Sequence, residues 1–420
     1  MNTAQVVRNA GFLVAAKIIG YLFPLLTLPV LTRSLGPTYY GELQYIHSLI
    51  AIFFLFTEYG SSVTATRAVA KVRGAELQTA EIFSRVVFLR LFLCTVAYFA
   101  MFVFCTLQGF SAHRFLLVSV SFLMPIGEAL NPSWLYIGQE NTKILATSSL
   151  IARAIALPLI VLFVRSGSDL GFAVFFTTLP WLIGGVISFV RSAKYFCFLQ
   201  VLRNLHWLWV DLRLGFSAAV SNVSSNVGQS IAAVILGTVA PRESVATFGV
   251  TLILITAAKQ VLFPISQVMY AHSSFLDSNN VAQNPGSRKL KMLFAIGILG
   301  LLCSLCLFVG AVFAIPIIFG NKYGSAVELV KVVSAVPFVF IVSQTTAFEY
   351  LYSKHLDYLV SRAMIVGNVV CVVLSFLICH KLQEFGAALS VLVGEVFSAV
   401  FVIFFALSTK NVSLKSVQTH

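Results

Sequence analysis

The sequence predicts an all-α integral membrane protein with about twelve transmembrane helices, and two features of its composition carry this prediction. Hydrophobic residues make up 59% of the 420 residues, whereas charged residues make up only 10%. A soluble domain has roughly 45–50% apolar and about 25% charged residues. The surplus of apolar side chains must therefore face lipid. Helices can cross a lipid bilayer because they satisfy their own backbone hydrogen bonds.

Apolar runs along the chain give the expected positions of the helices. Each run is long enough for a span, which needs about 20 apolar residues, and polar or turn-forming residues separate one run from the next. The expected spans are 10–32, 43–66, 82–107, 115–137, 143–164, 170–190, 214–238, 244–270, 291–319, 326–352, 358–379 and 385–408. The longest gaps, 191–213 and 271–290, are too short to hold a separate catalytic domain.

The distribution of Lys and Arg predicts the orientation of the chain. With the N-terminus in the cytoplasm, the inner segments hold 17 of these residues and the outer segments hold 7. Because cytoplasmic loops carry an excess of basic residues, we expect both termini in the cytoplasm. The net charge of +13 is explained by this topology and by phosphate binding, and nothing in the sequence resembles a nucleic-acid-binding module.

The chain is expected to form two six-helix halves, residues 1–200 and 201–420, around a central cavity. A turn at Leu35-Gly36-Pro37 follows the first helix, and a similar turn at Val239-Ala240-Pro241 follows the seventh. Each turn precedes an aromatic-glycine pair and another long helix. Repeated halves of this kind are common in transporters.

Ionisable residues inside the expected spans are the strongest functional signal, because a charge at the bilayer centre costs about 2.5–3.5 kcal/mol. The candidate cations are Lys17, Arg90, Arg153 and Lys259, and the candidate anions are Glu58, Glu128, Glu349 and Glu395. They could neutralise one another in pairs, or they could serve a transported ligand. Arg90 lies near a helix end and is expected to snorkel to the interface. The deeper Lys17, Arg153 and Lys259 are candidates for binding the phosphate of an anionic substrate, and Glu58 and Glu395 are candidates for ion coupling.

A polar stripe on the seventh helix is a second signal. Asn222, Asn226 and Gln229 have the spacing i, i+4 and i+7, which places them on one helical face. They could simply hold helices together, with about 0.6 kcal/mol for each hydrogen bond. We favour the alternative that they form the wall of a hydrated cavity suited to sugar hydroxyls.

The sequence carries none of the common catalytic or metal-binding motifs. It has neither a phosphate-binding loop of the G-x-x-x-x-G-K-[ST] type nor an H-E-x-x-H motif, and its histidines are scattered. Cys303 and Cys306 form a C-x-x-C inside an apolar run, where small packing residues are expected. We therefore expect no enzymatic activity, no metal and no cofactor.

Several motifs follow one another in a characteristic order and spacing along the chain. The most specific is Tyr21-Leu22-Phe23-Pro24-Leu25-Leu26-Thr27-Leu28-Pro29, which leads to Leu35-Gly36-Pro37 and Tyr40-Gly41. The others are Glu58-Tyr59-Gly60 with Thr64-Ala65-Thr66-Arg67, Asn131-Pro132-Ser133-Trp134-Leu135-Tyr136 with Gly138-Gln139-Glu140, Pro264-Ile265-Ser266-Gln267 with Tyr270, Gly320 with Tyr323, and Gly386-Ala387-Ala388 with Glu395. Together these motifs resemble the Wzx-type O-antigen flippases, which belong to the polysaccharide transporter branch of the multidrug/oligosaccharidyl-lipid/polysaccharide exporter superfamily. The resemblance covers nearly the whole chain.

This resemblance implies a multi-pass protein of the bacterial inner membrane that moves undecaprenyl-pyrophosphate-linked O-antigen repeat units by alternating access. It also implies an O-antigen polymerase and a chain-length regulator as partners. Two other functions stay open: a multidrug antiporter of the same superfamily, which should favour acidic and aromatic groups, and a membrane glycan polymerase or ligase. The latter typically needs a large outer loop, and the sequence predicts none.

Overall fold

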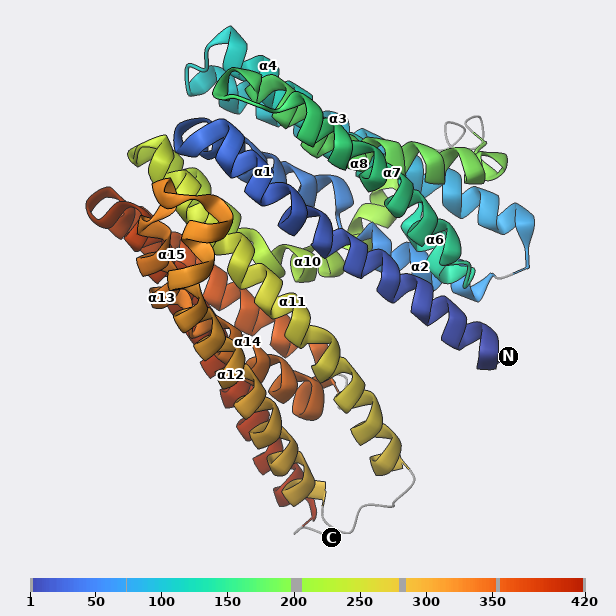
Figure 1. Ribbon diagram of the computed structural model, residues 1–420. Coiled ribbons are helices and arrows are strands. Elements are labelled where there is room, and N and C mark those ends of the chain that lie inside the picture. The colour runs from blue at the N-terminus through green and yellow to red at the C-terminus, as the bar shows by residue number, and fades with distance from the viewer. Residues whose placement is uncertain (1–2, 73, 198–205, 279–284, 353–355, 418–420) are drawn as a thin grey trace. The chain divides into compact units, whose positions relative to one another are not determined.

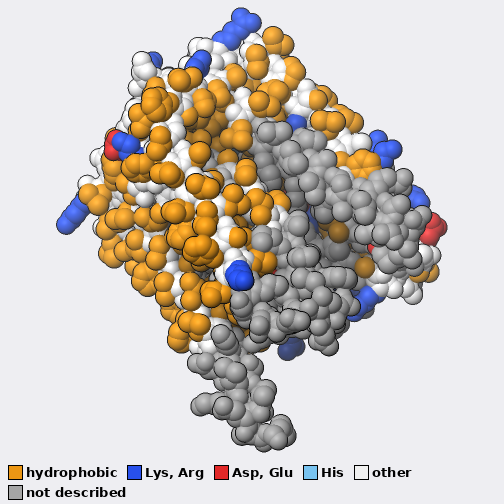
Figure 2. Space-filling model, turned by 60° about the horizontal axis from the view of Figure 1, so that its bottom comes forward, with side chains coloured by type: hydrophobic (Ala, Val, Ile, Leu, Met, Phe, Trp, Pro, Cys, Tyr) orange, Lys and Arg blue, Asp and Glu red, His pale blue; other side chains and the backbone are white. Residues whose placement is uncertain are grey.

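The computed structural model of the chain describes residues 3–72, 74–197, 206–278, 285–352 and 356–417. All the secondary-structure elements in these ranges are helices (Figure 1). Among the described residues, 9 helical segments are long and apolar enough to cross a membrane. Hydrophobic side chains cover much of the described surface in Figure 2, with Lys and Arg scattered among them. The prediction of an all-helical membrane protein is confirmed.

The chain divides into two compact units, Met1–Val223 and Ser224–His420. The division falls inside helix α10 (His206–Val239), later than the boundary at residue 200 that the sequence suggested. The predicted six-helix content of each half stays a prediction.

The first unit is organised around helix α1 (Thr3–Glu58), which packs against most other helices of this unit. The elements that follow it are α2 (Ser61–Lys71), α3 (Glu76–Leu107), α4 (Ala112–Ser121), α5 (Leu123–Leu130), α6 (Ser133–Gly138), α7 (Lys143–Phe163), η1 (Gly167–Asp169), α8 (Leu170–Ser192), η2 (Ala193–Tyr195) and the first part of α10.

Helix α1 is bent at the predicted turn. A straight helix of its 56 residues would be about 84 Å long, far more than the roughly 30 Å of bilayer hydrocarbon. Gly36 interrupts it with φ 71° and ψ 173°, a conformation that glycine adopts at little cost. The following Pro37 has no backbone N–H to donate. The turn after the first span is therefore confirmed, and α1 contains two apolar segments.

The second unit contains the rest of α10, α11 (Arg242–Ser278), α12 (Pro285–Phe319), η3 (Asn321–Tyr323), α13 (Ser325–Val333), α14 (Val336–Thr346), the π-helical turn η4 (Ala347–Leu351) and α15 (Asp357–Val417). Helix α14 packs against α11, α12 and α15. Only 22% of the residues in the most apolar part of α12 are buried within the protein, which suits a helix in contact with lipid.

Helix α15 is a hairpin of two limbs. Its 61 residues are interrupted at Gln383, which has φ 46° and ψ −125°. A Cβ atom on Gly367 would lie 2.5 Å from the carbonyl oxygen of Gly394, so the backbones of the two limbs touch. Small residues allow this close approach between membrane helices. The two limbs correspond to the expected spans 358–379 and 385–408.

Three expected spans are more broken than the sequence suggested, and one of them, 326–352, forms α13, α14 and the π-helical turn η4. The run 43–66 ends helix α1 at Glu58 and restarts as α2 at Ser61, with Tyr59 and Gly60 at positive φ. The run 115–137 forms three short helices, and its second break lies at Asn131, which is extended. Proline at position 132 explains this break, because the residue before a proline is disfavoured in the helical conformation.

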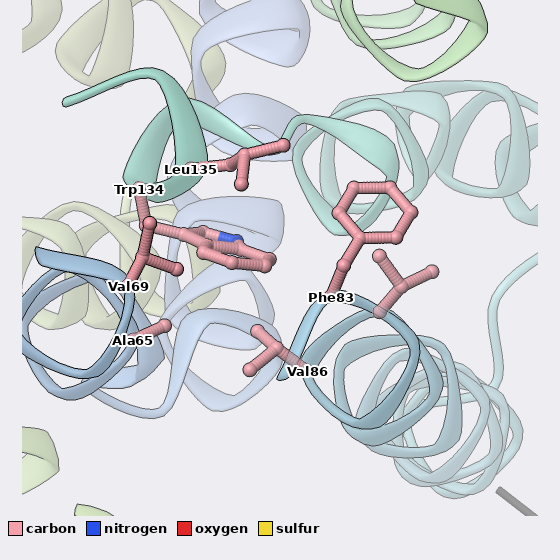
Figure 3. Packing of buried hydrophobic residues seen from close by; sticks show 7 residues of the cluster. Ala65, Val69, Phe83, Val86, Trp134 and Leu135 are labelled. Carbon is pink, nitrogen blue, oxygen red and sulfur yellow. The ribbon is translucent and has the colours of Figure 1, made fainter. Parts of the chain in front are cut away.

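The short helices α2 and α6 pack on one another and on the start of α3. The core of this cluster is formed by Ala65, Val69, Phe83, Val86, Val87, Trp134 and Leu135, all of them buried. Figure 3 shows the Trp134 ring lying between α2 and α3. The rings of Phe83 and Trp134 are 5.9 Å apart. This packing fixes the position of α2 against α3.

Candidate functional site

In the second unit, Lys259 is a buried cation with a carboxylate partner. Its Nζ atom donates a hydrogen bond to Oε1 of Glu395 at 2.5 Å, and it lies 4.7 Å from the centre of the Phe340 ring. The exposed fractions of the two charged side chains are 10% and 20%. The sequence named both residues as candidates, Lys259 for phosphate and Glu395 for ion coupling, and the structure brings them together.

The polar face of α10 joins this pair. Nε2 of Gln229 donates to Oε1 of Glu395 at 3.4 Å. One residue earlier, the backbone N–H of Gly228 donates to Oδ1 of Asn368 at 2.8 Å. Helices α10, α11 and both limbs of α15 thus contribute to one polar cluster. The side chains of Asn222 and Asn226 lie outside the part that the structure describes, so the predicted polar wall stays a prediction at those positions.

In the first unit, Arg153 on α7 lies beside α1. A Cβ atom on Gly20 would be 3.5 Å from Nη2 of Arg153, and Nη1 also donates to Oγ of Ser149. Among the described side chains, no carboxylate forms an ion pair with Arg153. Lys17 precedes Gly20 by three residues and therefore belongs to the same face of α1. The side chain of Lys17 is outside the described part.

The structure contradicts the prediction that Arg90 snorkels to the interface. Its exposed fraction is 0%, so the side chain does not snorkel to an interface. The guanidinium group donates to Oγ of Ser61 at 2.7 Å and to Oγ of Ser62 at 2.8 Å. It also donates to the carbonyl oxygens of Glu128 at 3.0 Å and Asn131 at 3.1 Å. These partners flank the two helix breaks, where backbone groups lack helical partners.

The acidic residues near Arg90 support pairwise neutralisation. Oε1 of Glu128 lies 3.7 Å from Nη1 of Arg90. Glu58, the last residue of α1, also interacts electrostatically with Arg90. The sequence offered Glu58 for ion coupling; the structure places it next to a buried arginine that a second carboxylate also contacts. Pairing is thus confirmed for Arg90 with Glu128 and for Lys259 with Glu395.

A pocket of about 210 Å³ opens between α2, α3 and α10 in the first unit. Its polar lining comes from Tyr59, Ser61, Thr64, Arg85 and Asp211. Nη2 of Arg85 donates to Oδ1 of Asp211 at 3.0 Å. Burial raises the pKa of the Asp211 carboxyl, although the charge of Arg85 and its hydrogen bond oppose this effect. We call this feature the Arg85 pocket.

Arg85, Asp211 and Asn368 are not among the site residues that the sequence predicted. Arg85 and Asp211 lie close to the predicted ends of spans, where a charge is usually explained by the lipid interface. Asn368 is a single amide within the apolar run 358–379. An intramembrane polar residue is a signal that could have identified it. Its partner is a backbone N–H, which no side-chain motif reveals.

Comparisons with known proteins agree with this architecture. Residues 6–271 match the model of a family described as "Polysaccharide biosynthesis protein". A protein of Escherichia coli (strain K12) named "Putative O-antigen transporter" is 27% identical over 412 residues, which are 97% of this chain and 98% of that protein. A protein of Shigella dysenteriae with the same name is 26% identical over 416 residues, covering 94% and 98%.

Solved structures share the fold. A MATE-family multidrug resistance transporter of the MOP superfamily, in an inward-facing conformation, superposes with a TM-score of 0.72 at 13% identity, covering 96% of this chain and 99% of the other. The lipid II flippase MurJ, in an inward closed conformation, gives 0.70 at 14% identity, covering 93% and 87%. At these identities, the likeness shows the fold alone.

Proposed function

This chain belongs to the polysaccharide biosynthesis protein family, and we propose that it is a flippase that moves lipid-linked oligosaccharides across the bacterial inner membrane. One observation carries the proposal: nearly the full length of the chain matches two proteins named as O-antigen transporters. The expected cargo is an undecaprenyl-pyrophosphate-linked O-antigen repeat unit. The proposal includes twelve spans, cytoplasmic termini and transport without covalent chemistry of its own.

The cation positions support an anionic cargo. Arg153 lies beside the face of α1 that carries Lys17, without a carboxylate partner among the described residues. A guanidinium group binds phosphate oxygens with two parallel hydrogen bonds, so Arg153 suits the pyrophosphate. The polar cluster around Gln229 suits sugar hydroxyls, because hydroxyls that leave water need replacement hydrogen bonds.

Lys259 and Glu395 would couple cargo to an ion. A phosphate that binds Lys259 competes with Glu395 for the same ammonium group. The released carboxylate is then left without its counter-ion and can bind a coupling cation. Glu58 is the corresponding candidate in the first unit. The membrane potential would add about 2.3 kcal/mol per charge per 100 mV to the outward movement of an anion.

The test follows surface glycan and cytoplasmic lipid-linked repeat units together in a strain that lacks the gene. We expect surface O-antigen to disappear and the lipid-linked unit to accumulate, with both effects reversed by the restored gene. Simultaneous removal of the charges of Lys17, Arg153 and Lys259 should prevent this rescue. The O-antigen polymerase and the chain-length regulator are proposed partners, and their loss should change chain length while translocation continues.

Other outcomes would overturn the proposal. Unchanged surface glycan would exclude this cargo and direct attention to the transport of small cations, as a multidrug antiporter would perform it. Surface glycans of a single repeat unit would indicate a lost polymerase. Membrane levels of each variant, measured by immunoblot, separate a failure of transport from a failure of insertion.

A further inference from the structure

We propose that the Arg85 pocket binds a phosphoryl anion, with Arg85 as the main ligand and Asp211 as a counter-ion that the anion displaces. This inference rests on the proposed function and deepens it. The pocket would be an initial binding site for the phosphate of the cargo, at the predicted cytoplasmic end of the third span. Its lining does not include Lys17, Arg153 or Lys259.

The two arginines on α3 differ in the way that a binding role requires. Arg90 is completely buried and makes four hydrogen bonds to protein atoms. Arg85 is one and a half turns earlier, and 28% of its side chain is exposed. It contacts one oxygen of Asp211 at 3.0 Å and, more loosely, Glu81 at 3.5 Å. Arg85 therefore has a reachable guanidinium group, whereas Arg90 is held by the fold.

Asp211 suits the role of a displaceable counter-ion. Its side chain is 25% exposed, and only its Oδ1 atom contacts Arg85. The pair is partly exposed and rests on a single contact, so a ligand that offers Arg85 more oxygen atoms can compete with Asp211. A phosphoryl group offers more oxygen atoms and a higher charge than one carboxylate, and it matches the geometry of arginine.

The rest of the pocket fits a small anion. Its volume of about 210 Å³ compares with roughly 30 Å³ for a water molecule in the liquid, so it holds a phosphoryl group with several waters. Tyr59 and Thr64 supply hydroxyl groups to the lining. Ala65 and Val86 form part of the wall, and both belong to the packed cluster in Figure 3. This part of the wall is therefore held by the packing of the cluster.

Trp207 lies next to Arg85 and can report on the occupancy of the pocket. The guanidinium carbon of Arg85 lies 5.4 Å from the centre of the Trp207 ring, and the same ring packs edge-on against Phe88 at 5.8 Å. A ligand that draws Arg85 away from Asp211 changes the environment of this indole. Tryptophan fluorescence of the full-length protein should therefore change when the pocket is filled.

The experiment titrates the purified full-length protein with inorganic pyrophosphate and follows tryptophan fluorescence, with calorimetry as a second measurement. We expect Arg85→Gln to weaken binding by about tenfold or more, since a hydrogen bond to a charged group is lost. Asp211→Asn should strengthen binding by roughly two- to fivefold, because the competing carboxylate is gone. Trp207→Phe should remove the fluorescence change while the calorimetric binding remains.

Arg191→Gln is the matched control, because Arg191 is an exposed arginine of the same unit at the end of α8. It removes the same charge and should leave binding unchanged. A purely structural Arg85–Asp211 pair predicts a different pattern: both single variants would lower the melting temperature, and Asp211→Asn would not improve binding. That pattern would overturn the proposal, as would a fluorescence change that survives in Trp207→Phe.

A second arm identifies the source of the anion. Nanodiscs that contain a long-chain polyprenyl phosphate are compared with nanodiscs of neutral lipid. Competition with pyrophosphate by the polyprenyl phosphate supports a site for lipid headgroups, and binding of pyrophosphate alone supports a site for free phosphate. Binding of neither overturns the inference. Because this assay measures binding alone, it can fail while complementation of surface glycan succeeds, so the two proposals are tested separately.

Discussion

The ammonium group of Lys259 and the carboxylate of Glu395 form a close ion pair, 2.5 Å apart, that ties α11 to the second limb of α15. Gln229 of α10 donates to the same carboxylate. Removing one partner of a buried pair leaves a charge without compensation, whereas removing both leaves a neutral site. The pair therefore allows a direct separation of structural and transport roles.

We expect Lys259→Met alone to destabilise the protein by about 3 kcal/mol, and the double variant Lys259→Met with Glu395→Leu to be clearly more stable than either single variant. Melting temperatures in detergent measure the effect of each variant on stability, and the amount of surface glycan measures its effect on transport. The proposed function requires the double variant to be folded and inactive. A folded double variant with full activity would show that the pair only holds helices together.

The buried guanidinium group of Arg90 should be important for stability. Arg90→Met leaves two carbonyl oxygens and two serine hydroxyls without their donor, and we expect a loss of about 3–5 kcal/mol. Arg90→Lys keeps the charge but supplies fewer donors in the wrong geometry, so its effect should be intermediate. Arg191→Met on the exposed end of α8 is the control, with an expected change within about 0.5 kcal/mol. Thermal unfolding with a normal midpoint in Arg90→Met would contradict the assigned role.

Helices α5 and α8 cross where Gly127 faces Gly185. A Cβ atom at residue 185 would overlap the backbone carbonyl of Gly127, which cannot rotate away as a side chain could. Gly185→Ala should therefore cost about 1–3 kcal/mol through overpacking. Gly310→Ala on α12 is the matched control, since a Cβ atom there meets nothing within 4 Å.

Melting temperatures of the two glycine variants in the same detergent compare them directly. Gly310→Ala should be neutral or slightly stabilising, because alanine is more favourable than glycine inside a helix by about 1 kcal/mol. Equal changes in melting temperature for Gly185→Ala and Gly310→Ala would show that α5 and α8 do not cross closely at Gly185.

The bend of α15 offers a stabilising substitution. Gln383 has φ 46° and ψ −125°, which L-residues rarely adopt, and its side chain makes one weak contact, 3.4 Å from Oγ of Ser244. Gln383→Gly should raise stability by roughly 1 kcal/mol, since glycine reaches this conformation without strain. Gln383→Val should lower it, because a branched side chain tolerates positive φ poorly. A Gln383→Gly protein with a lower melting temperature than wild type would argue that the limbs do not turn here.

The sequence alone predicted the helical membrane architecture, because lipid exposure demands apolar runs of a fixed length and these can be counted. It also predicted the turns at Gly36 and before Arg242, since glycine and proline act on the local backbone. Ionisable groups within the spans could also be identified one by one. The free-energy cost of placing such a group in a membrane depends on the surrounding lipid rather than on a particular partner.

Pairing, by contrast, was decided by the tertiary structure. Lys259 and Glu395 are far apart in the chain, and only the packing of α11 on α15 makes one the counter-ion of the other. The sequence predicted an interfacial position for Arg90. In the structure, the helix breaks at Gly60 and Asn131 place hydroxyl groups and carbonyl oxygens without helical partners around its guanidinium group. The Arg85 pocket exists only because the fold places Asp211 of α10 against Arg85 of α3. Hydrogen bonds and ion pairs depend on distances of about 3 Å, and helical periodicity within one segment does not determine distances between segments.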